Sequence, residues 1–227
     1  MKAKSLFVFI LAVILLSGCS GKTDVQNDSS LGTGQETGST PEEMDVQYID
    51  VSADWPAYAN VSALIKEANV VVVGKVTGIS FQILDLKNGG APTESSEQRN
   101  CSLCTIYDVE VGSLYKGNAD SKFQFFMYGG LKEEYLKEQL AALDSIDQKK
   151  IPVMEGTPYI EIGKTYLFVL YQYKDKMPTP LNLKQGVYRL DDPLKKDAYS
   201  YVSPKEIISY FGDDKWTAFI SEEDAAE

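Results

Sequence analysis

The chain has 227 residues, of which 22 are basic and 33 acidic, for a net charge of −11, and it contains no histidine. The lack of histidine excludes Ser-His-Asp and Cys-His catalysis and histidine-ligated metal sites. The acidic balance argues against nucleic-acid binding and against a basic patch for anionic lipid. No D-x-[DN]-x-[DN]-G calcium loop occurs, so we predict neither a metal nor a cofactor.

The first 18 residues are typical of an export signal. Lys2 and Lys4 precede an apolar run from Leu6 to Leu16, which is too short to span a bilayer as a finished helix. The run ends in Leu-Ser-Gly-Cys, which resembles the lipobox of bacterial lipoproteins. That resemblance implies cleavage before Cys19 and attachment of diacylglycerol and palmitate there. The alternative is an ordinary secretory signal with an incidental cysteine.

Residues 19–44 form a predicted tether behind this anchor. Between Ser20 and Glu43 only Val25 and Leu31 are large and apolar, so the segment cannot bury enough surface to offset its ordering entropy. Residues 45–227 are enough for one globular domain. Without Lys2 and Lys4 the mature charge is 20 − 33 = −13. We therefore expect the domain to be held by lipid at the extracytoplasmic face of the cell membrane.

The first half of the domain reads as a helix followed by two strands. Apolar residues at helical spacing predict a short helix over 60–69, which leads into the strand VVVVGKVTGISF with Gly74 and Gly78 at expected bulges. The polar stretch 85–100 is predicted to be a loop. Tyr107, Val109 and Val111 then alternate with polar residues, which predicts a half-buried strand over 105–118.

The second half contains three strands and two helices. KFQFFMY predicts a strand, and a leucine stripe predicts a helix from 131 to about 146, with Glu133 and Lys137 as an i,i+4 pair. TPYIEIGKTYLFVLYQY and QGVYRL are strand-like. SPKEIISYFG predicts a helix with Ser203 as its N-cap in a capping box. A last amphipathic piece spans 214–224.

The G-K-T at residues 163–165 raises the question of a phosphate-binding loop. Such a loop needs glycine five positions before Gly163 and a helix after it. This chain has Pro158 at that position and an apolar, β-branched and aromatic run afterwards. The sequence therefore predicts a turn into a buried strand and no nucleotide site.

The order of elements favours a mainly β fold with helices, of the α+β class. Three strands, a helix between strands 3 and 4, two closing strands and C-terminal helical additions match a five-stranded OB-like barrel. A glycine-bent first strand fits, because the first strand of such a barrel pairs on both sides. A generic α+β sandwich is the alternative.

Four motifs resemble a group of exported bacterial proteins of largely uncharacterised function. They are EANVVVVGKV, LYKG, PYIEIGKTYLFVL and QGVYRL, between about Leu64 and Leu190. Such domains are similar in layout to the OB-like modules of netrins and tissue inhibitors of metalloproteinases. The inhibitors use a free N-terminal cysteine, whereas Cys19 is expected to be acylated. The resemblance thus implies fold and compartment, and no inhibitory activity.

Three sets of residues are candidate sites. Cys101 and Cys104 in CSLC precede the second strand, where no helix N-terminus would activate a thiol, so they are either a local disulfide or idle thiols. The loop 85–100 is the preferred binding region, because OB modules often bind there. Its candidate residues are Lys87, Asn88, Glu94 and Arg99. A third set consists of aromatic rings, which could form a glycan- or peptide-binding platform, although a barrel core lined with rings is the favoured explanation: Tyr107, Tyr115, Phe123, Phe125, Phe126, Tyr128, Tyr166, Phe168 and Tyr171.

The sequence predicts a non-enzymatic binding or accessory lipoprotein with no catalytic residue. Its partner would be an envelope protein, a peptide or a glycan, in addition to the membrane. Two alternatives stay open. A carboxylate-dependent hydrolase would need two acidic side chains in one cleft, about 5 to 9.5 Å apart. A thiol-redox lipoprotein would need a reactive Cys101–Cys104 pair.

Overall fold

The computed structural model describes residues 46–87, 89–144, 146, 150–174, 176–190 and 202–212. Cys19, the tether and the amphipathic piece at 214–224 lie outside these residues. The strands are β1 (Gln47–Val51), β2 (Val70–Asp85), β3 (Cys101–Lys116), β4 (Lys122–Tyr128), β5 (Lys150–Met154), β6 (Thr165–Tyr171), β7 (Thr179–Pro180) and β8 (Val187–Arg189). The helices are α1 (Val61–Glu67), α2 (Leu136–Asp144) and α3 (Pro204–Tyr210), with one 3-10 turn at Gln98–Asn100.

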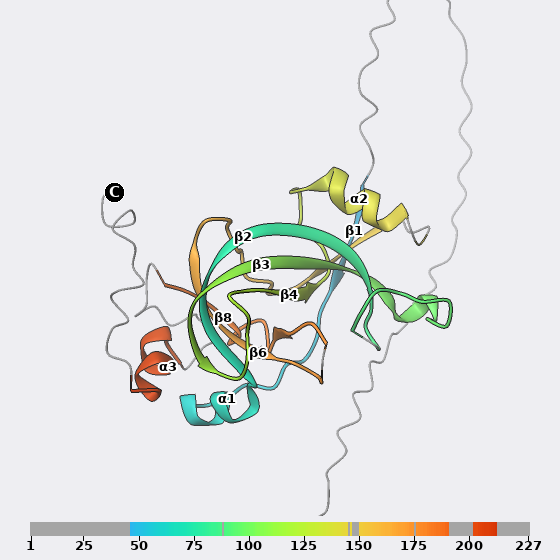
Figure 1. The fold of residues 1–227 in the computed structure, drawn as a ribbon. Coiled ribbons are helices and arrows are strands. Elements are labelled where there is room, and N and C mark those ends of the chain that lie inside the picture. Colours follow the sequence, from blue (N-terminus) through green and yellow to red (C-terminus); the bar gives the residue numbers. More distant parts are fainter. Residues whose placement is uncertain are drawn as a thin grey trace, which may run out of the picture. The chain divides into compact units, whose positions relative to one another are not determined.

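One antiparallel sheet contains most of the strands, in the order β4-β3-β2-β6-β7, and β8 also pairs with β6. In Figure 1, β2 and β3 run side by side as two long, curved ribbons. The predicted bulges are confirmed, because the β2–β3 register shifts at Val73/Gly74 and at Val76/Gly78. Gly74 is required there, since a Cβ on it would lie 2.8 Å from the Glu110 carbonyl oxygen.

A second, two-stranded sheet pairs β1 with β5 in parallel. Neither strand was predicted from the sequence. Both are only five residues long, and one of them contains Pro152, so their periodicity is weak. The tyrosine of β1, Tyr48, accepts a hydrogen bond from the Glu133 backbone N–H at 3.0 Å and so ties this sheet to the segment before α2.

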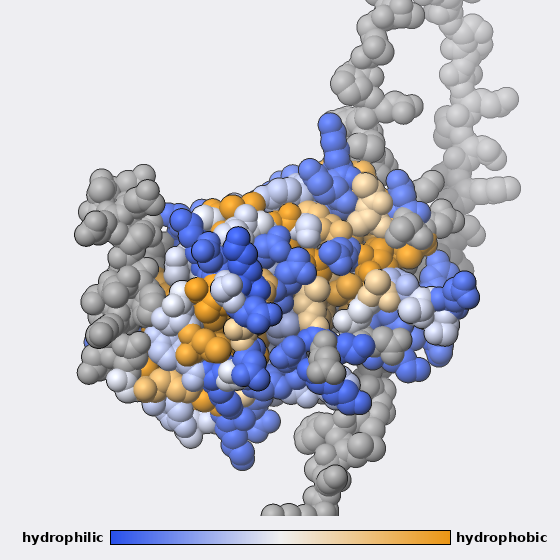
Figure 2. Space-filling model, in the orientation of Figure 1, coloured by the Kyte–Doolittle hydropathy of each residue, from blue (hydrophilic) through white to orange (hydrophobic). Residues whose placement is uncertain are grey.

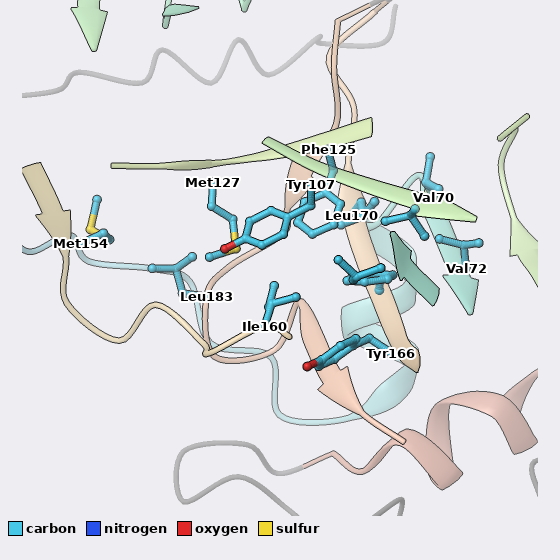
Figure 3. Packing of buried hydrophobic residues seen from close by; sticks show 13 residues of the cluster. Val70, Val72, Tyr107, Phe125, Met127, Met154, Ile160, Tyr166, Leu170 and Leu183 are labelled. Atoms are coloured by element: carbon cyan, nitrogen blue, oxygen red, sulfur yellow. The ribbon is translucent and has the colours of Figure 1, made fainter. Parts of the chain in front are cut away.

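The first five residues of β2 and the interior of β6 are buried on both faces, which explains their continuous apolar sequences. One face joins an aromatic core shown in Figure 3, and the other packs under α1 and α3, which lie near each other in Figure 1. The aromatic core contains Val70, Val72, Val76, Tyr107, Val109, Phe125, Met127, Met154, Ile160, Tyr166, Phe168, Leu170 and Leu183. The helical core contains Leu64, Ile65, Ala68, Val71, Val73, Leu167, Val169, Tyr188, Leu190, Val202, Ile207 and Ile208.

The two helices on this second face have well-defined ends. Asn60 caps α1 by accepting the Ala63 N–H at 2.9 Å, and Lys116 Nζ donates to the Ile65 and Ala68 carbonyls at 2.5 and 2.6 Å. The predicted capping box of α3 is confirmed: Ser203 Oγ accepts the Glu206 N–H at 3.3 Å, and the Glu206 carboxylate accepts the Ser203 N–H at 2.7 Å.

The helix expected from residue 131 begins later, at Leu136. Glu133 and Tyr135 have φ values of +65° and +50°, which no right-handed helix accommodates. Glu133 therefore lies outside α2, and the predicted helical pair with Lys137 does not form within the helix. From Leu136 onward, the leucine side chains of the helix pack inward as predicted. Leu143 is fully buried in a cluster that includes Ile151.

The turn at G-K-T is confirmed as the entry to a strand. Gly163 has φ +88°, its N–H donates to the Val76 carbonyl at 2.7 Å, and β6 starts at Thr165. The fold class is thus mainly β with three helices in the described part of the chain, and the strand pairings found there form open sheets. No described helix is long and apolar enough to cross a membrane. Figure 2 shows hydrophilic side chains over much of one face, with smaller apolar patches between them.

Candidate functional site

The preferred binding loop, predicted over residues 85–100, is organised around Asp85, which is the last residue of β2. Asp85 is buried, and its carboxylate accepts the Ser96 hydroxyl at 2.6 Å and the Lys87 N–H at 3.0 Å. Its backbone N–H donates to the Gly90 carbonyl at 2.8 Å, and its carbonyl accepts the Gly89 N–H at 2.6 Å. One buried carboxylate therefore holds both the first turn and the middle of the loop.

The predicted loop residues that the structure describes are exposed. Lys87, Glu94 and Arg99 are exposed, and no hydrogen bond or ion pair joins these three to one another. Arg99 pairs instead with Glu97 at 2.6 Å, and such exposed pairs contribute little to stability. Asn88 lies outside the described residues. The loop presents separate polar groups on a fixed backbone.

The cysteine motif lies within β3 and does not precede it, which corrects the sequence prediction. Both thiols are free and buried. Three positions along a strand cover about 10 Å and reverse the direction of the side chain, whereas a disulfide needs Cα atoms about 4.4–6.8 Å apart. Accordingly Cys101 packs with Leu103 and Ile151, and Cys104 packs with a different cluster. The local disulfide is not formed.

Neither thiol is activated. Burial raises the pKa of Cys104 to about 12, and its hydrogen bond with the Gly129 backbone lowers that pKa only slightly in comparison. Burial, and then the Asp85 carboxylate, also raise the pKa of Cys101. The thiolate is the reactive form, so this environment opposes redox chemistry.

Four of the rings proposed for a platform form the centre of the aromatic core. Tyr107 stacks on Phe125 with centroids 4.9 Å apart, Phe125 contacts Phe168 at 4.9 Å, and Phe168 contacts Tyr166 at 5.8 Å. All four are essentially inaccessible to solvent. Of the others, Tyr171 is 41% exposed and Tyr115 packs on Phe211 under α1 and α3. The core interpretation therefore accounts for most of this set.

One buried polar atom of the aromatic core, the Tyr107 hydroxyl oxygen, lacks a hydrogen-bond partner. In Figure 3 the hydroxyls of Tyr107 and Tyr166 both point away from Val70 and Val72, toward the same side of the cluster. Burial, followed by the nearby Tyr166, Glu134 and Tyr135 side chains, raises the pKa of Tyr107. A buried polar atom without a partner is rare and calls for an explanation.

The segment just before α2 is held in a strained conformation, with positive φ values at Glu133 and Tyr135. The fully buried Gln139 amide accepts the Leu131 N–H at 3.0 Å and donates to the Leu131 and Glu134 carbonyls at 2.8 and 2.5 Å. Gly130 leaves room for this amide, because a Cβ there would collide with it. The Gln139 hydrogen bonds, which we call the Gln139 clamp, fix the backbone that carries the Glu134 and Tyr135 side chains. Backbone strain of this kind often accompanies function.

A second segment, between β5 and β6, meets the first. Tyr159, in this second segment, is 63% exposed, and the charge of the Glu134 side chain acts on it. The charge of Glu134 is the main reason that the pKa of Tyr159 is raised, with Glu161 adding to it. We call Glu134, Tyr135 and Tyr159 the tyrosine–glutamate surface.

Glu161 is fixed beside this surface rather than within it. Its N–H donates to the Tyr166 hydroxyl at 2.9 Å, and its carboxylate pairs with Arg189 at 2.6 Å. In contrast, no described cation pairs with the Glu134 carboxylate. The described residues contain no group of three or more metal-binding side chains.

Sequence reasoning missed the tyrosine–glutamate surface. Glu134 and Tyr159 are 25 positions apart in the chain, and the helix predicted from residue 131 gave no reason to single out Glu134. No protein-family model matches this chain, and no curated protein matches it.

Proposed function

We propose that this chain is an extracytoplasmic lipoprotein that holds a non-enzymatic binding module at the cell membrane. The Leu-Ser-Gly-Cys motif supports acylation of Cys19 with diacylglycerol and palmitate, and the polar stretch 20–43 supports a tether. The acidic composition supports an anchor made of lipid rather than of basic residues. The ligand would be an envelope protein, a peptide or a glycan.

The module is proposed to be a five-stranded OB-like barrel formed by β2, β3, β4, β6 and β8. In support, β2 pairs with β3 on one side and with β6 on the other, and β8 pairs with β6. The helix α2 lies between β4 and β6 in the chain, as expected for this fold. A hydrogen bond from the Phe126 N–H of β4 to the Pro178 carbonyl, 3.0 Å long, links β4 to the segment before β7.

The observation that carries the binding proposal is the construction of the β2–β3 loop. Asp85 and Ser96 hold its backbone, while Lys87, Glu94 and Arg99 face solvent. A loop of fixed backbone with outward polar side chains loses little conformational entropy when it binds. Loops placed on a rigid sheet are also where binding residues most often occur.

The two enzymatic alternatives gain less support. A hydrolase would use Glu134 and Glu161, both of which are close enough to Tyr159 to raise its pKa. However, Glu161 is already engaged in an ion pair with Arg189 at 2.6 Å, and no described hydrogen bond or ion pair joins it to Glu134. A thiol-redox function would use Cys101 and Cys104, which pack in separate clusters.

The test is an affinity capture with the full chain in detergent, challenged with solubilised envelope proteins and with cell-wall glycan. The test variant carries Lys87→Ala, Glu94→Ala and Arg99→Ala. The control carries Lys66→Ala, Glu67→Ala and Lys205→Ala, which remove the same charges from exposed positions in and beside α1 and α3. We expect a reproducible partner that is lost from the test variant and kept by the control. Equal retention by both variants would reject the loop as the binding site.

A further inference from the structure

The first residues of the domain are attached to it by few contacts. The structure describes residues 46–60 throughout, and none of their side chains is buried. In the described part of the chain, β1 pairs with β5 alone, through five residues in parallel. A segment with few buried apolar contacts opens at a lower free-energy cost than global unfolding. We call residues 46–55 the N-terminal arm.

The N-terminal arm covers an apolar cluster, which we call the Cys101 cluster. Val46 and Tyr48 are half-buried and pack against it, and helix α2 covers the same cluster as well. The Tyr48 hydroxyl also accepts the Glu133 N–H at 3.0 Å. Opening of the arm therefore removes one cover of the cluster and unpairs one edge of β5. The buried residues of the Cys101 cluster are Ile83, Cys101, Leu103, Leu143 and Ile151.

The chain just after the arm is fixed by two buried side-chain amides. Gln185 Oε1 accepts the Tyr58 N–H, and Gln185 Nε2 donates to the Tyr58 carbonyl, both at 2.8 Å. Asn182 Nδ2 donates to the Pro56 carbonyl at 2.9 Å. Asn182 and Gln185 are each only 1% exposed, so release of Pro56 and Tyr58 would leave buried polar groups unpaired. This part of the chain is therefore more costly to detach than β1.

A hinge lies between the weakly and the strongly attached segments. Residues 52–55 are exposed and belong to no helix or strand. Segments move about a few such residues, which absorb the change in backbone angles. We propose that the N-terminal arm is a lid that opens as one unit about residues 52–55, uncovering the Cys101 cluster and one edge of β5, while Pro56 and Tyr58 stay in place.

The arm is also the part of the domain to which the predicted tether is joined. In the proposed lipoprotein, a pull between the membrane and the domain acts on β1 before it reaches any other element. Such a pull favours the open arm, because the open chain is longer and the equilibrium shifts toward the state that the pull prefers. Only this consequence rests on the proposed function, because the opening itself needs neither lipid nor partner.

The first experiment is amide hydrogen exchange, measured by NMR on the full chain in nonionic detergent micelles. We expect the amides that pair β1 with β5 to exchange at least about 100-fold faster than those that pair β2 with β3. Low concentrations of urea should barely change that faster rate, because local opening exposes little surface. Exchange between β1 and β5 as slow as between β2 and β3 would overturn the lid.

A cross-strand disulfide provides the decisive comparison. Asp50 and Val153 are opposite each other in β1 and β5, and neighbouring strands lie about 4.7–4.9 Å apart, which a disulfide can span. In the Asp50→Cys, Val153→Cys protein, oxidation should lower iodoacetamide labelling of Cys101 at least about tenfold relative to the reduced protein and to the parent. Cys104 packs in a different cluster, so its labelling should not change. Equal labelling of Cys101 in the oxidised and parent proteins would overturn the arm as its cover.

Gln185→Met tests the fixed end of the arm. Methionine has a similar size but cannot form the two bonds with Tyr58, so the Tyr58 amide should exchange at least about tenfold faster. Lys122→Met, at an exposed position of β4, is the matched control and should leave that amide unchanged. Equal exchange of the Tyr58 amide in both variants would reject the buried amides as the fixed end. The disulfide comparison does not depend on whether the Gln185 variant folds.

Discussion

Cys104 and Cys101 are separated by the geometry of the strand that contains them. Cys104 is fully buried beside Leu84 and Ile106, and Cys101 is buried among the residues that pack under α2. A thiol in an apolar environment loses the hydration that would stabilise its thiolate. These two residues therefore act as small apolar side chains, in a chain whose export signal predicts an oxidising compartment.

The first prediction concerns the reactivity of these thiols. With a pKa of about 12 in place of 9.0, the Cys104 thiolate fraction at pH 8 falls by about three orders of magnitude. We expect Cys104 in the native protein to react with iodoacetamide at least about 100-fold more slowly than in the denatured protein. Peptide mapping by mass spectrometry after timed labelling measures each cysteine separately. Labelling of native Cys104 at the denatured rate would contradict the burial of this residue.

At the scale of an element, the segment 131–135 and helix α2 form one unit joined by Gln139. Its amide satisfies the Leu131 N–H, the Leu131 carbonyl and the Glu134 carbonyl, which would otherwise be left without partners in a partly buried place. The first turn of α2 therefore supports the position of Glu134 through the Gln139 side chain, which binds the Glu134 backbone carbonyl.

The second prediction is that Gln139→Leu destabilises the protein and loosens this segment. Leucine has nearly the same size but leaves the Leu131 N–H unpaired, so the free energy of unfolding should fall by about 2–4 kcal/mol. Urea titration measures that loss, and amide hydrogen exchange should accelerate at residues 131–135. Glu138→Ala, on the exposed face of the same helix, should change stability by less than about 0.5 kcal/mol. A Gln139→Leu protein as stable as this control would show that the clamp contributes little.

Elements with strong local signals were predictable. The strand β2 carries continuous β-branched residues, and α3 carries Ser203, Pro204 and Glu206 at the positions that a capped helix start requires. The start of α2 was not predictable, because its leucine stripe extends the pattern while the positive φ of Glu133 depends on contacts with Tyr48 and Gln139. Long-range contacts of this kind have no periodicity in the sequence.

The same reasoning applies to the candidate sites. The β2–β3 loop was predictable, because polar residues and glycines between two strand patterns indicate a loop whatever the fold. Its anchoring by Asp85 was not, since the sequence does not show that this carboxylate is buried against Ser96. The tyrosine–glutamate surface joins residues from two separate connections, and a single sequence contains no signal for that pairing.

At the scale of the whole molecule, the acidic net charge of the chain does not help the proposed lipid anchor to hold the domain on a membrane. Anionic lipid attracts basic segments by about 1 kcal/mol per residue, and an acidic chain gains no such attraction. One acyl chain gives only marginal binding, whereas two or three hold a protein firmly. In the proposed lipoprotein, the acyl chains on Cys19 hold this domain on the membrane.

The last prediction tests that dependence. Cys19→Ser should move the chain from the membrane fraction to the soluble fraction and abolish incorporation of an alkyne-labelled palmitate. The Tm of the released chain should equal that of the parent, because the lipid site lies outside the domain that begins near residue 45. Lys22→Ser, three residues along the tether, serves as the matched control and should stay with the membrane. A Cys19→Ser chain that survives a high-salt and carbonate wash on the membrane would contradict lipid anchoring and favour a retained N-terminal apolar segment as the anchor.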